Sequence, residues 1–167
     1  VGATRFLTPE YRTTATIYIE PPPDNAGPIR AAELLRSVGW LELLTTGVVL
    51  DSVAITQRLY LTPASEKDSL VLRELTLTDK FKTGYYKLQV DKTGKAWTLE
   101  SASAGAVVDR GAVGDSIGRP VGFLWAPAPE TLGADRTIGF EVVTAREAGL
   151  RLAKNLSTQL NNQQQAN

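Results

Sequence analysis

Hydrophobic and polar positions alternate with a two-residue period in two segments that are far apart in the chain. In residues 13–20, apolar and β-branched side chains would face one side, and the prolines at 21–23 end the run because proline cannot donate to a sheet ladder. Residues 137–143 show the same period, with Ile138, Phe140 and Val142 on the apolar side. Both segments are predicted to form half-buried strands.

The most distinct hairpin pattern lies in residues 84–101. Tyr86, Leu88 and Val90 alternate with polar neighbours, and the returning arm places Trp97 and Leu99 on one face. The tetrapeptide Asp91-Lys92-Thr93-Gly94 lies between the arms, and its glycine can adopt a left-handed conformation. Two antiparallel strands joined by a tight turn are therefore predicted here.

Apolar residues recur at steps of three and four in three other segments, which is the period of an amphipathic helix. Residues 29–45 form the first of these, and residues 48–61 form a second that is apolar around much of its circumference and is therefore expected to be well covered. The third begins at Ala145, where Thr144 and Glu147 fit a capping box. It is expected to be long, because apolar residues share one face along it: Ala148, Leu152, Leu156 and Leu160. The tail after Leu160 contains only asparagine, glutamine and alanine, and is either frayed or the first turns of a longer helix.

The remaining segments give weaker signals. Residues 62–69 are predicted as a polar loop, and residues 70–78 fit either a strand or a short helix. Residues 102–129 are rich in glycine, alanine and proline, with short irregular strands expected near 106–109 and 121–125. Strands and helices mix without a regular βαβ rhythm. The predicted fold is therefore a single α+β domain over residues 1–167, with a mixed or antiparallel sheet, helices packed on one face and a long C-terminal helix.

Composition removes several functional classes. The chain has 18 basic and 18 acidic residues, so it lacks the basic surplus of a general nucleic-acid binder. It contains no cysteine and no histidine, which removes thiol nucleophiles and the commonest general base and metal ligand. It also contains no methionine, even at position 1, and we expect it to be a piece of a longer protein.

No arrangement of residues predicts a catalytic, cofactor-binding or metal-binding site. The scattered carboxylates are interpreted as solvated surface: Glu20, Asp24, Glu33, Glu42, Asp51, Asp79, Asp109 and Asp115. The glycine-rich segment 111–118 lacks the Gly-Lys-Ser/Thr of a phosphate loop, so tight turns are expected. Trp40, Trp97 and Trp125 are interpreted as core residues rather than a sugar-stacking platform. The tripeptide Asn155-Leu156-Ser157 matches a glycosylation acceptor but lies in a predicted helix.

Two segments carry a resemblance to a known family. The first is Pro9-Glu10-Tyr11-Arg12-Thr13-Thr14-Ala15-Thr16-Ile17-Tyr18-Ile19-Glu20-Pro21, and the second is Leu43-Leu44-Thr45-Thr46-Gly47-Val48-Val49-Leu50-Asp51-Ser52-Val53. They resemble the first periplasmic strand and the leucine-rich helix pair of chain-length determinant proteins, the Wzz/Wzc/GumC-like polysaccharide co-polymerases. The strand at 140–143 and the helix after it resemble the return toward the periplasmic coiled-coil helices of Wzc- and GumC-like members.

The resemblance implies a periplasmic domain of a bacterial inner-membrane protein, with membrane helices outside this sequence. Such a protein is not an enzyme and needs no cofactor. It forms homo-oligomeric rings and works with a polysaccharide polymerase or an outer-membrane export channel to set the chain length and export of exopolysaccharide, capsule or O-antigen. Some members carry a separate cytoplasmic tyrosine-kinase domain, of which this chain contains nothing. The polysaccharide itself is a further partner to consider.

The residues leave other functions open. The chain also fits a glycan- or peptide-binding module of a cell-envelope export complex, or a periplasmic adaptor with a lipoyl-like β-sandwich built from residues 111–122. For the ring-forming function, the expected lateral surfaces are the exposed face of the helix at 48–61 and the start of the C-terminal helix. Charge reversal at Arg58 or Arg151 would test those surfaces.

Overall fold

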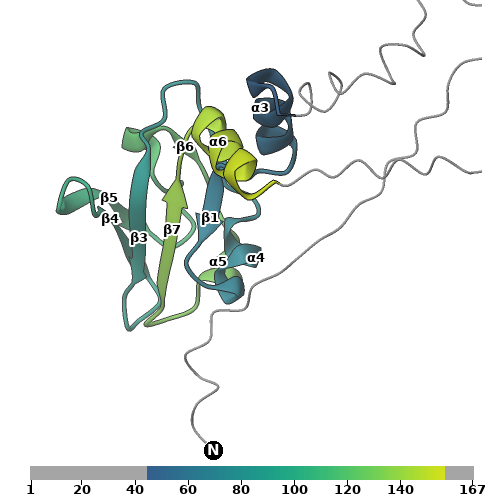
Figure 1. Ribbon diagram of the computed structural model, residues 1–167. Helices are drawn as coiled ribbons and strands as arrows, with labels where there is room; N and C mark the ends of the chain where they lie inside the picture. The colour runs from purple at the N-terminus through teal and green to yellow at the C-terminus, as the bar shows by residue number, and fades with distance from the viewer. Residues whose placement is uncertain (1–44, 157–167) are drawn as a thin grey trace, which may run out of the picture. The chain divides into compact units, whose positions relative to one another are not determined.

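A computed structural model describes residues 45–156, which belong to one compact unit of the chain. The predicted strand at 13–20, the predicted helix at 29–45 apart from its last residue, and the tail from 157 lie outside the described residues. The helices and strands follow one another in this order (Figure 1): α3 Gly47–Thr56, β1 Leu61–Pro63, η2 Glu66–Asp68, α4 Ser69–Leu72, β2 Thr76–Leu77, β3 Gly84–Val90, β4 Ala96–Ser101, β5 Ala106–Ala112, η3 Arg119–Val121, β6 Phe123–Leu124, α5 Pro129–Leu132, β7 Thr137–Val142 and α6 Ala145–Asn155.

The central element is a five-stranded antiparallel sheet with the strand order β1-β7-β3-β4-β5. Strands β2 and β6 form a separate two-stranded antiparallel sheet. The late strand β7 lies between β1 and β3, so the sheet is completed by a segment distant in sequence from both. The predicted α+β class with an antiparallel sheet is confirmed.

The predicted hairpin at 84–101 is confirmed as β3 and β4. Val90 pairs with Trp97 at the turn end of the ladder. The Asp91 carboxylate accepts a hydrogen bond from the Lys95 amide at 2.8 Å, and Gly94 has a φ of 68°. The turn therefore uses an aspartate to bind a backbone amide and a glycine where a side chain would strain the backbone.

The core lies on one face of the large sheet, and aromatic rings fill its centre. The Phe140 ring lies 5.7 Å from that of Tyr86, 5.9 Å from Phe123 and 5.6 Å from Trp125, measured between centroids. The Trp125 indole N–H donates to the Val71 carbonyl at 3.1 Å, so the polar end of the ring is satisfied although it is buried. The side chains predicted to share the apolar face of β7 are all fully buried: Ile138, Phe140 and Val142.

The second predicted helix is shorter than its apolar pattern suggested. The prediction extended it over 48–61, but α3 ends at Thr56 and Leu61 begins a strand. Leu61 fits the helical period, but it pairs with Val142 in the sheet instead, because tertiary contacts outweigh local helix preference here. The predicted loop at 62–69 was also wrong in part, because it contains most of β1 and the short helix η2.

The two segments with weaker signals, residues 70–78 and 102–129, each contain more than one kind of element. Residues 70–78 contain both alternatives, since most of α4 and all of β2 fall within them. The strand expected near 106–109 extends further, as β5 over Ala106–Ala112, and the one expected near 121–125 is the short strand β6. Irregularity is present in β5 as a register shift opposite Leu99 and Glu100.

The C-terminal helix α6 begins where the capping residues predicted. The Thr144 hydroxyl accepts a hydrogen bond from the Glu147 amide at 3.1 Å. The Glu147 carboxylate bonds to Arg151 one turn later, rather than returning to the cap as a complete capping box would require. The helix is described as far as Asn155, so the predicted long helix is supported only in part.

Candidate interaction surface

Helices α3 and α6 pack closely against each other and form a small core of their own. Ala54 and Ala148 are buried in it together with Val143. A Cβ atom added at Gly149 would lie 3.2 Å from the Leu50 Cβ, so the small residues permit a close helix approach. This core is separate from the aromatic core beneath the sheet.

Most of the exposed apolar side chains gather on this helix pair. Among the described residues, seven of eleven exposed large apolar side chains lie on α3, the turn after it, α6 or the residue that ends α6. We call these seven the α3–α6 apolar patch: Val48, Val49, Val53, Ile55, Leu59, Leu150 and Leu156. Val48 is 82% exposed and Ile55 58%, whereas Leu50 and Ala54 face inward. Exposed large apolar side chains gathered on one pair of elements mark an interaction surface, so this patch is a candidate surface for a partner.

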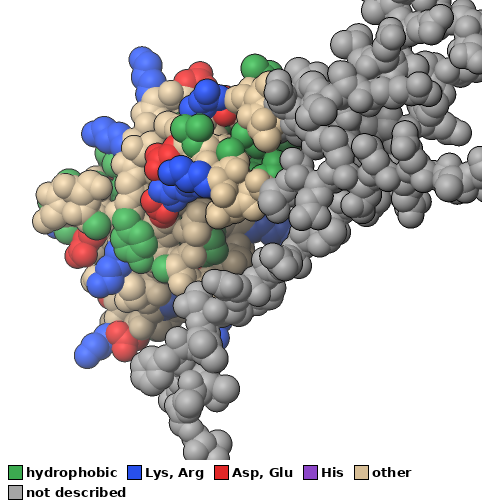
Figure 2. All heavy atoms as spheres, in the orientation of Figure 1, with side chains coloured by type: hydrophobic (Ala, Val, Ile, Leu, Met, Phe, Trp, Pro, Cys, Tyr) green, Lys and Arg blue, Asp and Glu red, His purple; other side chains and the backbone are tan. Residues whose placement is uncertain are grey.

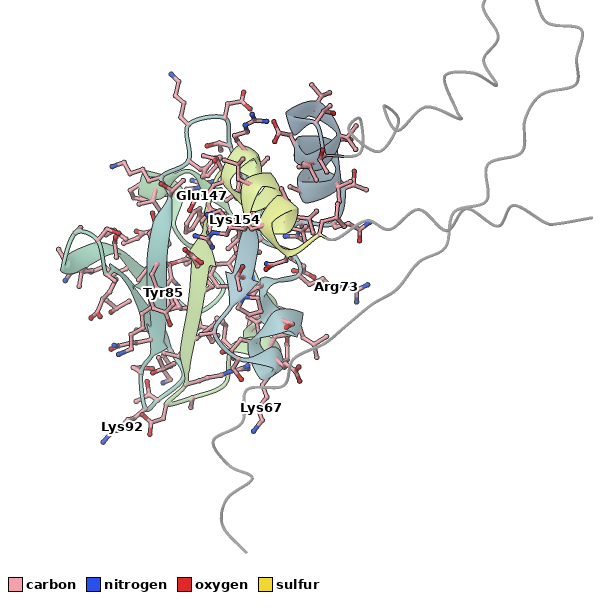
Figure 3. All side chains as sticks on the ribbon, in the orientation of Figure 1. Lys67, Arg73, Tyr85, Lys92, Glu147 and Lys154 are labelled. Atoms are coloured by element: carbon pink, nitrogen blue, oxygen red, sulfur yellow. The ribbon has the colours of Figure 1, made fainter. Side chains whose placement is uncertain are left out.

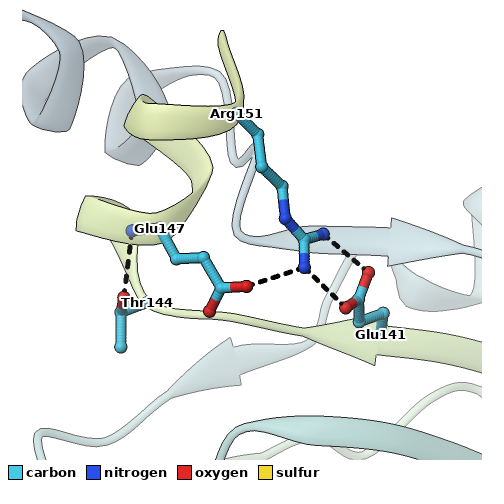
Figure 4. Close-up of polar contacts among 4 residues, drawn as sticks. All are labelled: Glu141, Thr144, Glu147 and Arg151. Atoms are coloured by element: carbon cyan, nitrogen blue, oxygen red, sulfur yellow. Dashed lines mark hydrogen bonds and ion pairs between the residues drawn. The ribbon is translucent and has the colours of Figure 1, made fainter. Parts of the chain in front are cut away.

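Arg151 of α6 is held by two carboxylates (Figure 4). Its guanidinium donates to both oxygens of Glu141 on β7, each at 2.8 Å, and to Glu147 at 2.7 Å. The bonds from Arg151 hold the pKa of Glu141 below its ordinary value. The two carboxylates raise the pKa of Arg151 above its ordinary value. Arg151 therefore joins the helix to the sheet.

Arg58 lies in the turn after α3, with a φ of 54°. Its guanidinium donates to the carbonyl of Leu72 at 3.4 Å and to those of Arg73 and Leu75. Leu72 and Arg73 lie at the end of α4 and Leu75 lies just beyond it, where the helix leaves backbone acceptors open. The Leu72 carbonyl also accepts from the Leu75 amide at 3.1 Å. Sequence reasoning treated Arg58 and Arg151 as surface charges. Charge reversal at either residue would break these bonds and disturb the fold. The carbonyls that Arg58 binds lie 14 to 17 residues away in the sequence, so no local pattern around Arg58 predicts them.

The carboxylates singled out in the sequence do not converge on a catalytic centre in the described part of the chain. Asp109 accepts from the amides of Arg110 and Gly118, and Asp115 accepts from the amide of Ala112. No group of three metal-binding side chains occurs among residues 45–156. The other two described carboxylates are in α3 and in a loop: Asp51 and Asp79. Four lie outside the described residues: Glu20, Asp24, Glu33 and Glu42.

The bonds of Asp109 and Asp115 protect the edge of the large sheet. Strand β5 is at that edge, and the amides of Arg110 and Ala112 are both bound by carboxylates close to them in sequence. An open edge amide is a site for pairing with another chain. The two aspartates therefore oppose extension of the sheet at this end of β5.

The glycine-rich segment 111–118 forms turns, as predicted. The Asp115 amide donates to the Ala112 carbonyl at 3.0 Å, and Gly114 and Gly118 have φ angles of 105° and 77°. The helix that follows has only three residues, so it provides no extended N-terminus for a phosphate.

Trp97 and Trp125 are both buried, which confirms that they are core residues. Trp40 lies outside the described residues. Asn155 is the last residue of α6, and its side-chain amide donates to the Arg151 carbonyl at 3.2 Å, while Ser157 lies outside the described residues.

Neither a protein-family model nor a curated protein matches this sequence. Within residues 45–156, no helix combines the length and the apolar character that a membrane crossing requires.

Proposed function

We propose that the chain is a non-enzymatic periplasmic domain of an inner-membrane polysaccharide co-polymerase that controls polysaccharide chain length and export through oligomeric rings. The resemblance of residues 9–21 and 43–53 to chain-length determinant proteins supports this function. The α+β fold is compatible with it. The observation that carries most weight is the α3–α6 apolar patch, because a protein that assembles with copies of itself needs apolar surface outside its core.

The proposed partners follow from the same resemblance. They are further copies of the chain, a polysaccharide polymerase or an outer-membrane export channel, and the polysaccharide. The proposed location is the periplasm, with anchoring in the inner membrane by helices of a longer protein.

The structure identifies better positions for testing the lateral surface than Arg58 and Arg151. Val48 and Ile55 project outward from α3, so an aspartate at either position would add charge to the patch without emptying a buried site. Ser65, just before η2, is exposed and lies on neither α3 nor α6, which makes Ser65→Asp a matched control that adds the same charge outside the patch. Val48→Asp and Ile55→Asp should reduce oligomer size in the membrane-anchored parent, whereas Ser65→Asp should leave it unchanged.

The decisive experiment is made in the native strain. The coding region for residues 1–167 is deleted from the parent gene, and the surface polysaccharide is separated on a gel. Loss or shortening of the long chains supports the co-polymerase function. Unchanged polysaccharide, with the membrane-anchored remainder still present, refutes it and favours a glycan- or peptide-binding module of an envelope complex.

The adaptor alternative receives no support from the fold. A periplasmic adaptor would have a lipoyl-like β-sandwich built from residues 111–122. These residues instead form the end of β5, tight turns and the short helix η3.

A further inference from the structure

A hollow of ≈ 340 Å³ lies on the large sheet, on the face opposite the aromatic core. Strands β3, β4 and β5 form its floor, and the turn between β4 and β5 forms one side. Its lining includes Tyr85, Lys87, Glu100, Gly105 and Val107. Tyr85 and Lys87 alternate with the buried residues of β3, which places their side chains on this outer face.

Tyr85 presents an aromatic ring whose position is restrained by its neighbours. A Cβ atom added at Gly139 would lie 2.3 Å from the Tyr85 hydroxyl oxygen and 3.0 Å from the Ala64 Cβ. The ring therefore crosses β7 at a residue with no side chain. Tyr85 nevertheless remains 42% exposed, and Figure 3 shows it projecting from the middle of the sheet. An exposed, preorganised ring offers a flat apolar surface at small entropic cost.

Two opposite charges lie beside this ring. Lys87 and Glu100 are directly paired across β3 and β4. Within the described residues, neither side chain takes part in a hydrogen bond or ion pair, and the Tyr85 hydroxyl also has no partner. Figure 2 shows acidic and basic side chains interspersed over this side of the molecule, so the hollow does not lie in a field of one sign. An uncharged ligand with many hydroxyl groups suits one free donor and one free acceptor better than an anion or a cation does.

We infer that this face of the sheet binds a neutral oligosaccharide, with the apolar face of one sugar unit against the Tyr85 ring and with Lys87 and Glu100 bonding the hydroxyl groups of the next unit, in the hollow. Lys87 donates and Glu100 accepts, so both hydrogen-bonding roles of a hydroxyl are matched. The inference deepens the proposed function by naming a ligand class and a surface for it, and it rests on that function only for the source of the sugar.

The test uses the 167-residue chain labelled with ¹⁵N, and follows its amide resonances during titration. The probes are cellohexaose, a neutral oligosaccharide, and a hexamer of galacturonic acid, which is anionic. Cellohexaose should shift the amides of the residues that line the hollow. Tyr85→Ala should weaken this binding about three- to tenfold, and Tyr85→Phe should retain it because the ring remains. Lys92→Ala, at the far tip of the hairpin in Figure 3, is the matched control and should bind as the unaltered chain does.

Several results would overturn the inference. These are no shift with cellohexaose, shifts centred away from the hollow, equal binding by the Tyr85→Ala variant, or tighter binding of the galacturonate hexamer. The titration needs neither the membrane nor an oligomer. If cellohexaose causes no shifts but the deletion strain makes shortened polysaccharide, the sugar site alone is rejected. If cellohexaose binds at the hollow but the deletion strain makes unchanged polysaccharide, the co-polymerase function alone is rejected.

Discussion

Replacing Arg58 with methionine removes the guanidinium that joins the turn after α3 to the end of α4. Methionine keeps a long apolar side chain at the position, so the substitution mainly deletes the donors. The carbonyls of Leu72, Arg73 and Leu75 then lose a charged partner. If Arg58 is structural, the chain should lose stability even though the residue lies in a surface turn.

The expected loss follows from the exposure of these bonds. A hydrogen bond to a charged group contributes about 1.5–3 kcal/mol net to stability. The Leu72 carbonyl keeps the Leu75 amide as a partner at 3.1 Å when Arg58 is replaced. The Arg73 carbonyl is at an exposed position, and those of Leu72 and Leu75 are partly buried, so water will replace part of what is lost. We therefore expect Arg58→Met to lower the free energy of unfolding by about 2 kcal/mol, rather than by three full bonds. Arg58→Lys keeps a charge but loses the forked donors of the guanidinium. Its free energy of unfolding should lie between those of the unaltered chain and the Arg58→Met variant.

Urea unfolding followed by tryptophan fluorescence measures this loss. Trp125 is a suitable reporter because its indole binds Val71, next to a carbonyl that Arg58 binds. The matched control is Arg73→Met, since Arg73 is exposed and its side chain has no hydrogen bond or ion pair within residues 45–156 (Figure 3). If the two methionine variants differ by less than about 0.5 kcal/mol, the structural role assigned to Arg58 is refuted.

Three further substitutions test other parts of the fold. Arg151 lowers the pKa of Glu141, so their pairing contributes stability above the unfolded carboxyl's pKa, and that contribution is lost as the pH falls through the folded pKa. Glu141→Gln should therefore flatten the acid limb of a plot of urea midpoint against pH; an unchanged limb contradicts this. Gly122→Ala places a Cβ atom 2.6 Å from the Phe81 Cα, at a residue whose φ is 83°. It should lower the free energy of unfolding, measured by thermal unfolding, by more than about 2 kcal/mol, and a loss under about 1 kcal/mol would argue against the clash. Asp115→Ala frees an edge amide of β5 and should increase light scattering on concentration; scattering equal to that of the unaltered chain would show that this bond does not protect the edge.

Local sequence signals succeeded where a short segment contains the whole physical cause. The β3–β4 hairpin needs only alternating side chains and a turn that tolerates Gly94, and both are local properties. The start of α6 needs only the Thr144 hydroxyl within reach of the Glu147 amide, and that bond is present. The same alternation had already separated Tyr85 from the buried Tyr86, so one wall of the hollow was visible in the sequence.

Local signals failed where a distant partner decides the outcome. The helical period of residues 48–61 gave no reason to stop at Thr56, because the competing interaction is the pairing of Leu61 with Val142. Arg58 resembled any surface charge, since the carbonyls it binds become available only when α4 ends beside it. The largely apolar helix α3 was predicted to be well covered, yet Leu50 and Ala54 are the only two of its residues that are buried.

The sequence by itself determined the α+β class, the hairpin, the strand at 137–142 and the cap of the last helix, because period, turn chemistry and capping act within a few residues. The tertiary structure alone decided the strand order, the end of α3, the bonds of Arg58 and Arg151, and the meeting of Tyr85, Lys87, Glu100 and Val107 around one hollow. These features depend on strand register and helix contact between distant segments, and register is set by the packing of the whole sheet rather than by any one strand.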